Sequence, residues 1–339
     1  MLTGQRPIVV VGSINLDLVS KAEHIPVVGE TVLGDEFQMH PGGKGANQAV
    51  AIARLGYPVR MIGRLGSDLF GGQLRMDLQS SGVDLSGVEE ADGPSGVAAI
   101  IVAPHGENCI VVTPGVNVHV SPEYVDLHAE IIRNAGMVLT QLEIPIETVR
   151  HLAEICHRHG VPMMLDPAPA QKLPPGLLTH IQWFTPNETE AAFYVSSGLH
   201  ETLDGLTPSA TAHSLLTQGP RGILLKMGAR GAYLATDGIE EYLNAIAVEA
   251  VDTTAAGDAF NGAFAVGLQL GKTVRESARF AVAAAAHSVT RPGAQPSMPV
   301  ICEVEKMLEN ALLTSGADAH GTITARSTEP QWQGKGIID

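Results

Sequence analysis

Aromatic residues are scarce in this chain of 339 residues, where Phe, Trp and Tyr together make up 4%. Apolar residues still reach 45%, so the core has to be built from Ala, Val, Ile and Leu. A chain of this length is expected to form one large domain, with or without a small appendage, and it has ample residues for a core. The 37 glycines exceed the usual share of about 7% and predict many tight turns and close backbone approaches.

Basic residues, cysteines and long apolar runs are also few. The chain has 21 Lys and Arg against 36 Asp and Glu, a formal net charge of −15, which disfavours a nucleic-acid partner. The three cysteines, Cys109, Cys156 and Cys302, form no CxxC pattern and predict reduced thiols in a cytosolic protein. No apolar run is long enough for a membrane span, and no signal peptide precedes the first expected strand. We therefore expect a cytoplasmic protein that does not enter a membrane.

Short β-branched runs alternate with longer helical patterns through most of the chain. The expected strands are 8–11, 59–62, 137–140, 162–165, 183–185 and 222–226. The expected helices are 46–55, 70–80, 146–159 and 187–195, and a further apolar helix begins near Asp258. Strands separated by helices predict an α/β fold with a mostly parallel central sheet flanked by helices.

Two stretches interrupt this alternation. Residues 13–40 and 96–113 are strand-like and carry hairpin signals such as His105-Gly106-Glu107-Asn108. We predict that they leave the parallel core and pack together as a small antiparallel β-lid. These features belong to a domain at 1–313. Residues 314–339 are rich in Gly, Ser, Thr and Gln with almost no apolar pattern, which predicts a disordered or loosely attached tail.

The segment DTTAAGDAF, residues 252–260, is the strongest indication of chemistry. Small residues precede the start of a helix, where backbone N–H groups lack intrahelical partners, and this lets a phosphate approach those amides. The carboxylate of Asp258 would lie beside that phosphate and could take a proton from an attacking hydroxyl. The alternative is that Asp258 only caps the helix.

Two further clusters suit a polar ligand. The run Gly42-Gly43-Lys44-Gly45-Ala46-Asn47 combines close backbone approach with a charge and an amide, although an ordinary strand-to-helix turn would also explain its glycines. Asn15 and Asp17 alternate after the first strand, so that their side chains project to the same side. Paired donors and acceptors of this kind suit the neighbouring hydroxyls of a sugar.

Two clusters suit a nucleotide. Asn187 with Glu190 follows an expected strand and resembles a capping box, but Glu190 could also organise a hydrated Mg²⁺. The turn 228–231 after the strand at 222–226 could border the nucleotide. A P-loop is excluded, because Gly271-Lys272-Thr273 lacks the first glycine of that motif. A GxGxxG fingerprint is missing after the first strand, which argues against a nicotinamide-dependent oxidoreductase.

In combination these motifs resemble the ribokinase branch of the PfkB carbohydrate kinase family, over roughly residues 8–312. The resemblance rests on seven motifs in order: GSINLD from Gly12, GGKGANQA from Gly42, QLE ending at Glu143, DPAPA from Asp166, TPNETE from Thr185, DTTAAGDAFNGA from Asp252 and TRPGAQPSMP from Thr290. It implies a kinase that transfers a phosphoryl group from ATP to O5 of D-ribose. It also implies that the lid closes over the sugar and forms a homodimer.

The resemblance also assigns roles to single residues. It makes Asp258 the catalytic base and the backbone amides of Ala255, Ala256, Gly257 and Asp258 the anion hole. It places the ribose hydroxyls against Asn15, Asp17, Gly43, Lys44, Asn47 and Glu143. ATP would be bordered by Asn187, Lys226, Gly228, Arg230, Gly231 and Gly257, with Glu190 near Mg²⁺. A K⁺ ion would be held by Asp252, Thr254, Ser288, Arg291, Gly293 and Ser297, several of them through backbone carbonyls.

The chain departs from the family at a few positions, and other functions stay open. Val282 stands where many relatives carry a polar His or Asn near the adenine, and His40 with Pro41 has no family explanation. The substrate could be deoxyribose, another small sugar or a nucleoside. A non-catalytic sugar-binding regulator on the same scaffold is a further alternative, although a binder has no need of a base at Asp258.

Overall fold

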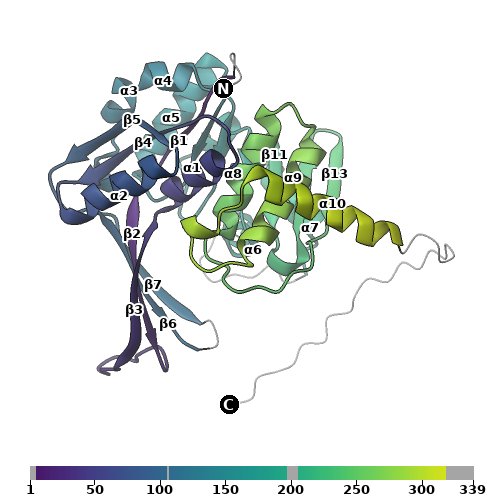
Figure 1. The fold of residues 1–339 in the computed structure, drawn as a ribbon. Helices are drawn as coiled ribbons and strands as arrows, with labels where there is room; N and C mark the ends of the chain where they lie inside the picture. Colours follow the sequence, from purple (N-terminus) through teal and green to yellow (C-terminus); the bar gives the residue numbers. More distant parts are fainter. Residues whose placement is uncertain (1–4, 105–106, 197–204, 318–339) are drawn as a thin grey trace.

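A nine-stranded sheet forms the centre of the molecule in the computed structural model, which describes residues 5–104, 107–196 and 205–317 (Figure 1). Its order is β13-β12-β11-β10-β9-β8-β1-β4-β5. The strands are β1 (Ile8–Val11), β4 (Val59–Gly66), β5 (Asp84–Ala91), β8 (Met137–Thr140), β9 (Met163–Leu165), β10 (Trp183–Phe184), β11 (Gly222–Lys226), β12 (Ala232–Thr236) and β13 (Ile239–Leu243). Neighbours from β5 to β11 are parallel, and β12 and β13 add an antiparallel edge. The expected mostly parallel sheet is confirmed.

Helices cover both faces of this sheet. One core contains side chains of α1 (Lys44–Arg54), α2 (Leu69–Ser80), α8 (Ala256–Gln269), α9 (Val274–Ser288) and α10 (Ile301–Ala317). The other contains side chains of α3 (Pro122–Leu127), α4 (Ala129–Arg133), α5 (Ile146–His159), α6 (Glu188–Ser196) and α7 (Pro208–Leu216). Alternation along β1 separates the two cores, since Val10 belongs to the first and Val9 and Val11 to the second.

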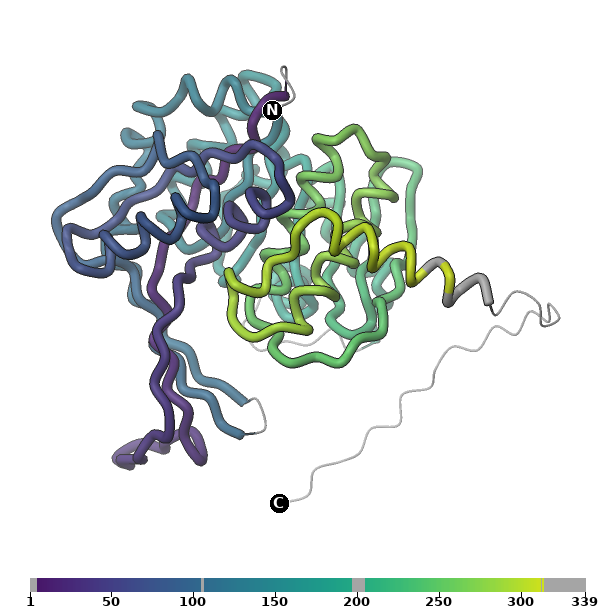
Figure 2. Tube along the Cα trace, in the orientation of Figure 1, coloured from purple at the N-terminus to yellow at the C-terminus, as the bar shows by residue number. Residues whose placement is uncertain are grey.

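A second sheet of four strands extends from the body as an arm (Figure 2). Its order is β3-β2-β6-β7, from β2 (Asn15–Ala22), β3 (Gly34–Gly42), β6 (Gly96–Val102) and β7 (Asn108–Thr113). The two expected excursions therefore do pack together as a lid. The lid is mixed rather than antiparallel, because β2 and β6 pair in parallel. Both strands leave the same carboxyl edge of the parallel sheet, after β1 and β5, so they run in the same direction.

The ends of the expected segments differ slightly from those observed. Helix α10 ends at Ala317, beyond the expected start of the tail at 314. Residues 318–339 of that tail, and His105 and Gly106 of the expected hairpin turn, lie outside the described residues.

None of the helices described is both long enough and apolar enough to cross a bilayer. Cys109, Cys156 and Cys302 are free thiols.

Candidate active site

The start of α8 has an unusual backbone. Ala255, which precedes the helix, has a φ of 59°, in the left-handed region, and is the one non-glycine residue at positive φ in the described ranges. Such a conformation costs about 1–2 kcal/mol for a residue with a Cβ and often marks a functional site. The N–H of Ala256 donates to the carbonyl of Thr253 at 3.3 Å. Those of Gly257 and Asp258 have no acceptor among the described residues, so they are available to an anion.

Asp258 lies in the first turn of α8 and is 5% exposed. Its carboxylate accepts hydrogen bonds from Nδ2 of Asn47 at 3.1 Å and from Nε2 of Gln48 at 3.0 Å. Burial raises the pKa of Asp258 to about 6; the nearby Lys44 opposes this shift and Asp166 adds to it. No side chain caps α8, so the alternative in which Asp258 serves as its cap is wrong. A carboxyl with a pKa of about 6 is suited to general base catalysis near neutral pH.

Close backbone packing fixes the start of α1. Gly43, before the helix, has a φ of 86°, and a Cβ there would lie 2.7 Å from the backbone N of Asn15. A Cβ on Gly45 would lie 2.7 Å from the carbonyl carbon of Gly12 and from the backbone N of Ser13. The glycines of this motif therefore allow α1 to begin against the end of β1, at the edge of the sheet where α8 also begins.

Lys44, the first residue of α1, is surrounded by carboxylates. Burial alone would lower the pKa of its ammonium group, but Asp258, Asp166, Glu143 and Glu190 outweigh burial and raise it. Lys44 is therefore a permanent cation beside the start of α8 at neutral pH. A charge so placed can neutralise a phosphate group.

Three expected sugar-binding residues, Asn15, Lys44 and Glu143, lie in one hydrogen-bonded group, and Asp17 lies close to it. Oε2 of Glu143 accepts from Oγ of Ser13 at 2.6 Å, from the backbone N–H of Lys44 at 3.2 Å and from Nδ2 of Asn15 at 3.4 Å. Asp17 is 9% exposed, and burial followed by the negative charges of Glu143 and Asp258 raises its pKa to about 7. Two carboxyls and an amide therefore lie in one polar region near the candidate base.

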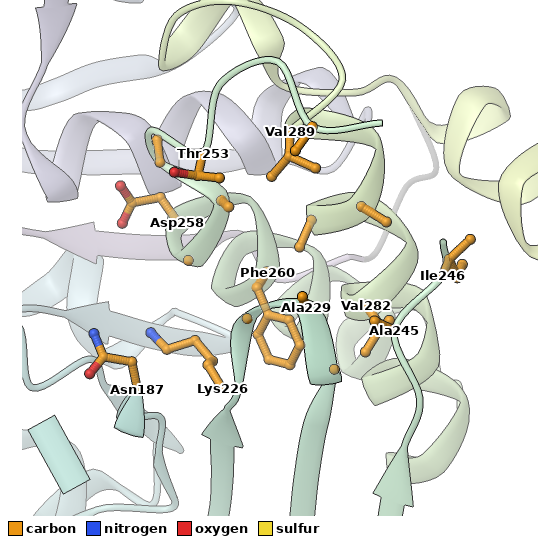
Figure 3. A pocket seen from close by; sticks show the side chains of 18 of the residues that line it. Asn187, Lys226, Ala229, Ala245, Ile246, Thr253, Asp258, Phe260, Val282 and Val289 are labelled. Atoms are coloured by element: carbon orange, nitrogen blue, oxygen red, sulfur yellow. The ribbon is translucent and has the colours of Figure 1, made fainter. Parts of the chain in front are cut away.

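A cavity of about 610 Å³ lies against the start of α8 (Figure 3). Its lining includes ten of the expected site residues, namely Lys44, Asn187, Glu190, Lys226, Gly228, Gly231, Ala255, Ala256, Gly257 and Asp258. In Figure 3 the polar side chains of Asn187, Lys226 and Asp258 gather at one end, and Ile246 and Val282 lie toward the other. This polarity suits a ligand with an anionic end and a flat apolar end.

Asn187 and Glu190 form the capping box that the sequence offered as one interpretation. The backbone N–H and Nδ2 of Asn187 donate to the Glu190 carboxylate at 2.8 and 2.9 Å, and Oδ1 of Asn187 accepts from the N–H of Glu190 at 2.8 Å. Burial raises the pKa of Glu190, against the lowering effect of Lys226. Arg230 is not part of the cavity lining; its guanidinium contacts Glu188.

Asp252 connects two of the other residues expected around a K⁺ ion, Thr254 and Gly293. Its carboxylate accepts from the backbone N–H of Thr254 at 2.9 Å and from that of Gly293 at 2.8 Å, and these bonds help to lower its pKa although burial opposes them. The hydroxyls of Ser288 and Ser297 donate to the carbonyls of Ala285 and Ala294 at 2.9 and 2.7 Å. The Arg291 side chain is ion-paired with Glu303 at 2.6 Å. Arg291 could therefore contribute to a cation site only through its carbonyl.

Several residues of this network carry no role in the sequence interpretation. Asp166, after β9, accepts from Nζ of Lys226 and from Nε2 of Gln48, both at 3.0 Å. Nδ2 of Asn117 donates to Oδ1 of Asn15 at 2.8 Å. Asp166 and Gln48 both stand in motifs that supported the resemblance, DPAPA and GGKGANQA, so both left a detectable signal. Asn117 left none.

Comparisons with known proteins agree with this geometry. The pfkB family carbohydrate kinase model matches residues 5–301. A ribokinase of Bacillus subtilis is 41% identical over 303 residues, covering 89% of this chain and 99% of the relative. A deoxyribokinase of Salmonella typhi is 37% identical over 303 residues, covering 89% and 98%. The structure of Arabidopsis thaliana ribokinase complexed with ribose and ATP superposes with a TM-score of 0.82 at 38% identity, covering 90% of this chain and 99% of that one. The chain is thus a ribokinase-like kinase and belongs to the pfkB family of carbohydrate kinases.

Proposed function

We propose that this protein transfers the γ-phosphoryl group of ATP to O5 of D-ribose, with Asp258 as the general base. The observation that carries the proposal is the buried carboxylate of Asp258 beside the free backbone N–H groups of Gly257 and Asp258. A base and an anion site within one helical turn are what a phosphoryl transfer to an alcohol needs, because that reaction depends on positioning and charge neutralisation.

The proposed reaction is one in-line displacement. The Asp258 carboxylate accepts the proton of the 5-hydroxyl while O5 forms a bond to the γ-phosphorus. The bond from that phosphorus to the bridging oxygen breaks, and its electron pair leaves with ADP. The free N–H groups at the start of α8 donate to the oxygens of the moving phosphoryl group, and Lys44 supplies a positive charge.

In this proposal the sugar lies between β2 and the start of α1. Asn15, Asp17 and Glu143 provide amide and carboxyl groups there, and Gly43 lets the start of α1 pack against the backbone of Asn15. Ring hydroxyls require both donors and acceptors, which this set supplies. The Arabidopsis relative, solved with ribose and ATP, supports ribose as the acceptor.

The nucleotide is assigned to the cavity, with its phosphates at the polar end and its base near Val282. The carboxylates of Glu190 and Asp166 both line the cavity, and oxygen groups of this kind fit a hydrated Mg²⁺ at that end. Both oxygens of Glu190 already accept from Asn187, so Glu190 would hold water of the ion's shell rather than the ion itself. When bound, the ion neutralises charge on the phosphates.

A monovalent cation, K⁺, is proposed beside the loop at 252–254. The fit rests on Asp252, whose carboxylate ties this loop to Gly293, and on a backbone bond from the N–H of Asp252 to the carbonyl of Val289 at 3.2 Å. Oxygen ligands from carbonyls and one carboxylate suit a hard cation. The residues around such an ion would hold the loop so that the α8 amides face the phosphate.

We also propose that the lid pairs with the lid of a second copy. By register, Leu18, Met39, Ala99 and Val111 share one face of the lid. Met39 is 56% and Val111 61% exposed, and apolar exposure of this extent marks an interaction surface. A self-complementary patch of this kind favours a two-fold dimer.

A panel of sugars, assayed by coupled ADP detection, tests the assignment. D-Ribose should give the highest kcat/KM. The Salmonella relative makes deoxyribose the second candidate, and a clear preference for it, or for any other acceptor, would overturn the ribose assignment.

The Asp258→Asn variant should still bind sugar but turn over about 10²–10⁴ times more slowly. Unchanged turnover would remove Asp258 from the mechanism.

A further inference from the structure

Gln48 lies in α1 directly after Asn47 and is 1% exposed. Its Nε2 donates to Oδ1 of Asp258 and to Oδ2 of Asp166, both at 3.0 Å. Its Oε1 accepts from Nε2 of Gln141 at 2.8 Å. Both hydrogens of the amide group and its oxygen are therefore engaged, so the side chain is held in a single orientation.

The orientation of this amide follows from the charges around it. A flipped amide would turn Oε1 toward the carboxylates of Asp258 and Asp166 and lose two hydrogen bonds to charged groups, which are stronger than hydrogen bonds between neutral groups. Gln141 supports the observed orientation by donating to Oε1. The amide thus stands between two buried carboxylates that would otherwise repel each other.

The same contacts connect the nucleotide side of the site to the sugar side. Lys226 lines the cavity and donates to Oδ1 of Asp166 at 3.0 Å. Asp166 accepts from Gln48, and Gln48 donates to Asp258. One continuous series of hydrogen bonds therefore leads from the cationic side chain in the cavity to the candidate base.

We propose that Gln48 is a positioning residue for the phosphoryl transfer, which fixes the Asp258 carboxylate toward the acceptor hydroxyl through its hydrogen bonds to Asp258 and Asp166. The inference rests on the proposed function, since it requires Asp258 to act as the base. Gln48 touches neither sugar nor nucleotide in this account. Its effect on turnover passes through the orientation and proton affinity of Asp258.

The effect of removing this donor on pH dependence has a definite sign. A hydrogen bond donated to a carboxylate stabilises its charged form, so losing the bond raises the pKa of Asp258 further above its usual range. Turnover requires the charged form, and its fall at low pH should begin at a higher pH. The other charged groups near Asp258 are Lys44, Asp166 and Asp17, and these remain in place in the variants.

Two variants test the proposal, with Gln73→Met as the matched control on the exposed surface of α2. Gln48→Met keeps the length of the side chain and removes both donors. Gln48→Glu keeps the shape and adds a third carboxyl next to Asp258 and Asp166. We expect kcat to fall by about ten- to a hundred-fold in Gln48→Met, as for a misplaced catalytic group, with little change in KM for ribose.

The pH profile is the decisive measurement. Its acidic limb should move to higher pH in Gln48→Met and further still in Gln48→Glu, whereas Gln73→Met should match the wild type. A second readout combines Gln48→Met with Asp258→Asn. If Gln48 acts through Asp258, the double variant should turn over no more slowly than Asp258→Asn alone.

Three outcomes would contradict the proposal. These are an unshifted acidic limb in both Gln48 variants, full additivity in the double variant, or wild-type kcat in Gln48→Met. If Gln48→Met does not fold, as judged by thermal melting, the comparison of Gln48→Glu with the wild type decides. The acidic limb of the pH profile must then lie at higher pH in Gln48→Glu than in the wild type. Should Asp258→Asn itself retain full turnover, the proposed function fails, and this result is distinct from a failure of the Gln48 inference.

Discussion

Replacing Asp258 by Asn should stabilise the protein while removing most of its turnover. Asp258 is only 5% exposed, and burial raises the pKa of its carboxyl to about 6 from an ordinary value of 3.8. A group with a raised pKa in the folded state contributes stability that is fully present below its unfolded pKa and is lost as pH rises through its folded pKa. At neutral pH the wild type therefore carries the cost of a buried charge, and the Asp258→Asn variant would not carry it.

The size of this cost follows from the shift. About two pKa units at roughly 1.4 kcal/mol each give a cost of about 3 kcal/mol above pH 7. At about pH 5, midway through the window between 3.8 and 6, the same linkage gives about half of that cost. Both figures are upper bounds. Asn47 and Gln48 both donate to the carboxylate of Asp258, and the amide of an Asn could accept only one of these hydrogen bonds because its NH₂ group would face the other donor.

Urea unfolding of wild type and Asp258→Asn at about pH 5 and pH 7.5 measures the effect directly. The variant should be the more stable at both values, with the larger difference at the higher pH. Turnover, measured on the same samples, should fall by about 10²–10⁴. A variant that is no more stable than the wild type at pH 7.5, or a difference that does not grow with pH, would refute the argument from buried charge.

Three further predictions concern packing, the cation and the lid. Gly45→Ala should lower the free energy of unfolding in urea by about 1–3 kcal/mol, because the new Cβ would meet backbone atoms 2.7 Å away. The control Gly72→Ala, at an open position of α2, should raise it by about 0.5–1 kcal/mol. The packing argument is contradicted if both variants change the free energy of unfolding equally. Activity in a Na⁺ or Tris buffer should rise when K⁺ is added, and Asp252→Asn should weaken that response; a flat wild-type response would remove the K⁺ assignment. Val111→Glu should shift the dimer toward monomer in sedimentation experiments, while the control Leu127→Glu, which also replaces an exposed apolar residue, should not. A dimer that is unchanged in Val111→Glu would show that the interface does not lie on this face of the lid.

The sequence predicted those parts of the fold and site that depend on neighbours along the chain. The parallel core followed from alternating strands and helices, and the lid from two strand-like stretches. Asp258 and Lys44 could be singled out because each stands at the start of a helix after glycines or other small residues. The parallel pairing of β2 with β6 could not be predicted, since it depends on where each strand leaves the main sheet.

Other site residues depend on contacts that no local pattern carries. Gln48 meets Asp258 across 210 positions of sequence, and Asn117 meets Asn15 across 102. Each is an amide whose role follows from its partners rather than from its flanking residues. A buried amide indicates that a partner must exist, because a buried amide without one is costly. The pattern does not reveal which partner that is.

The site also explains how a chain with a net charge of −15 can hold an anionic nucleotide. At physiological salt the Debye length is about 8 Å, so most surface carboxylates are screened from the phosphates. Within that range the positive contributions come from the start of α8, with its free amides, and from Lys44 and Lys226, which share the cavity lining with the carboxylates of Asp166, Glu190 and Asp258. These amides follow Ala255, which is held at positive φ, and they have no acceptor among the described residues. In the proposed reaction, donors of this kind would need no reorganisation, and this gain would offset the backbone cost at Ala255.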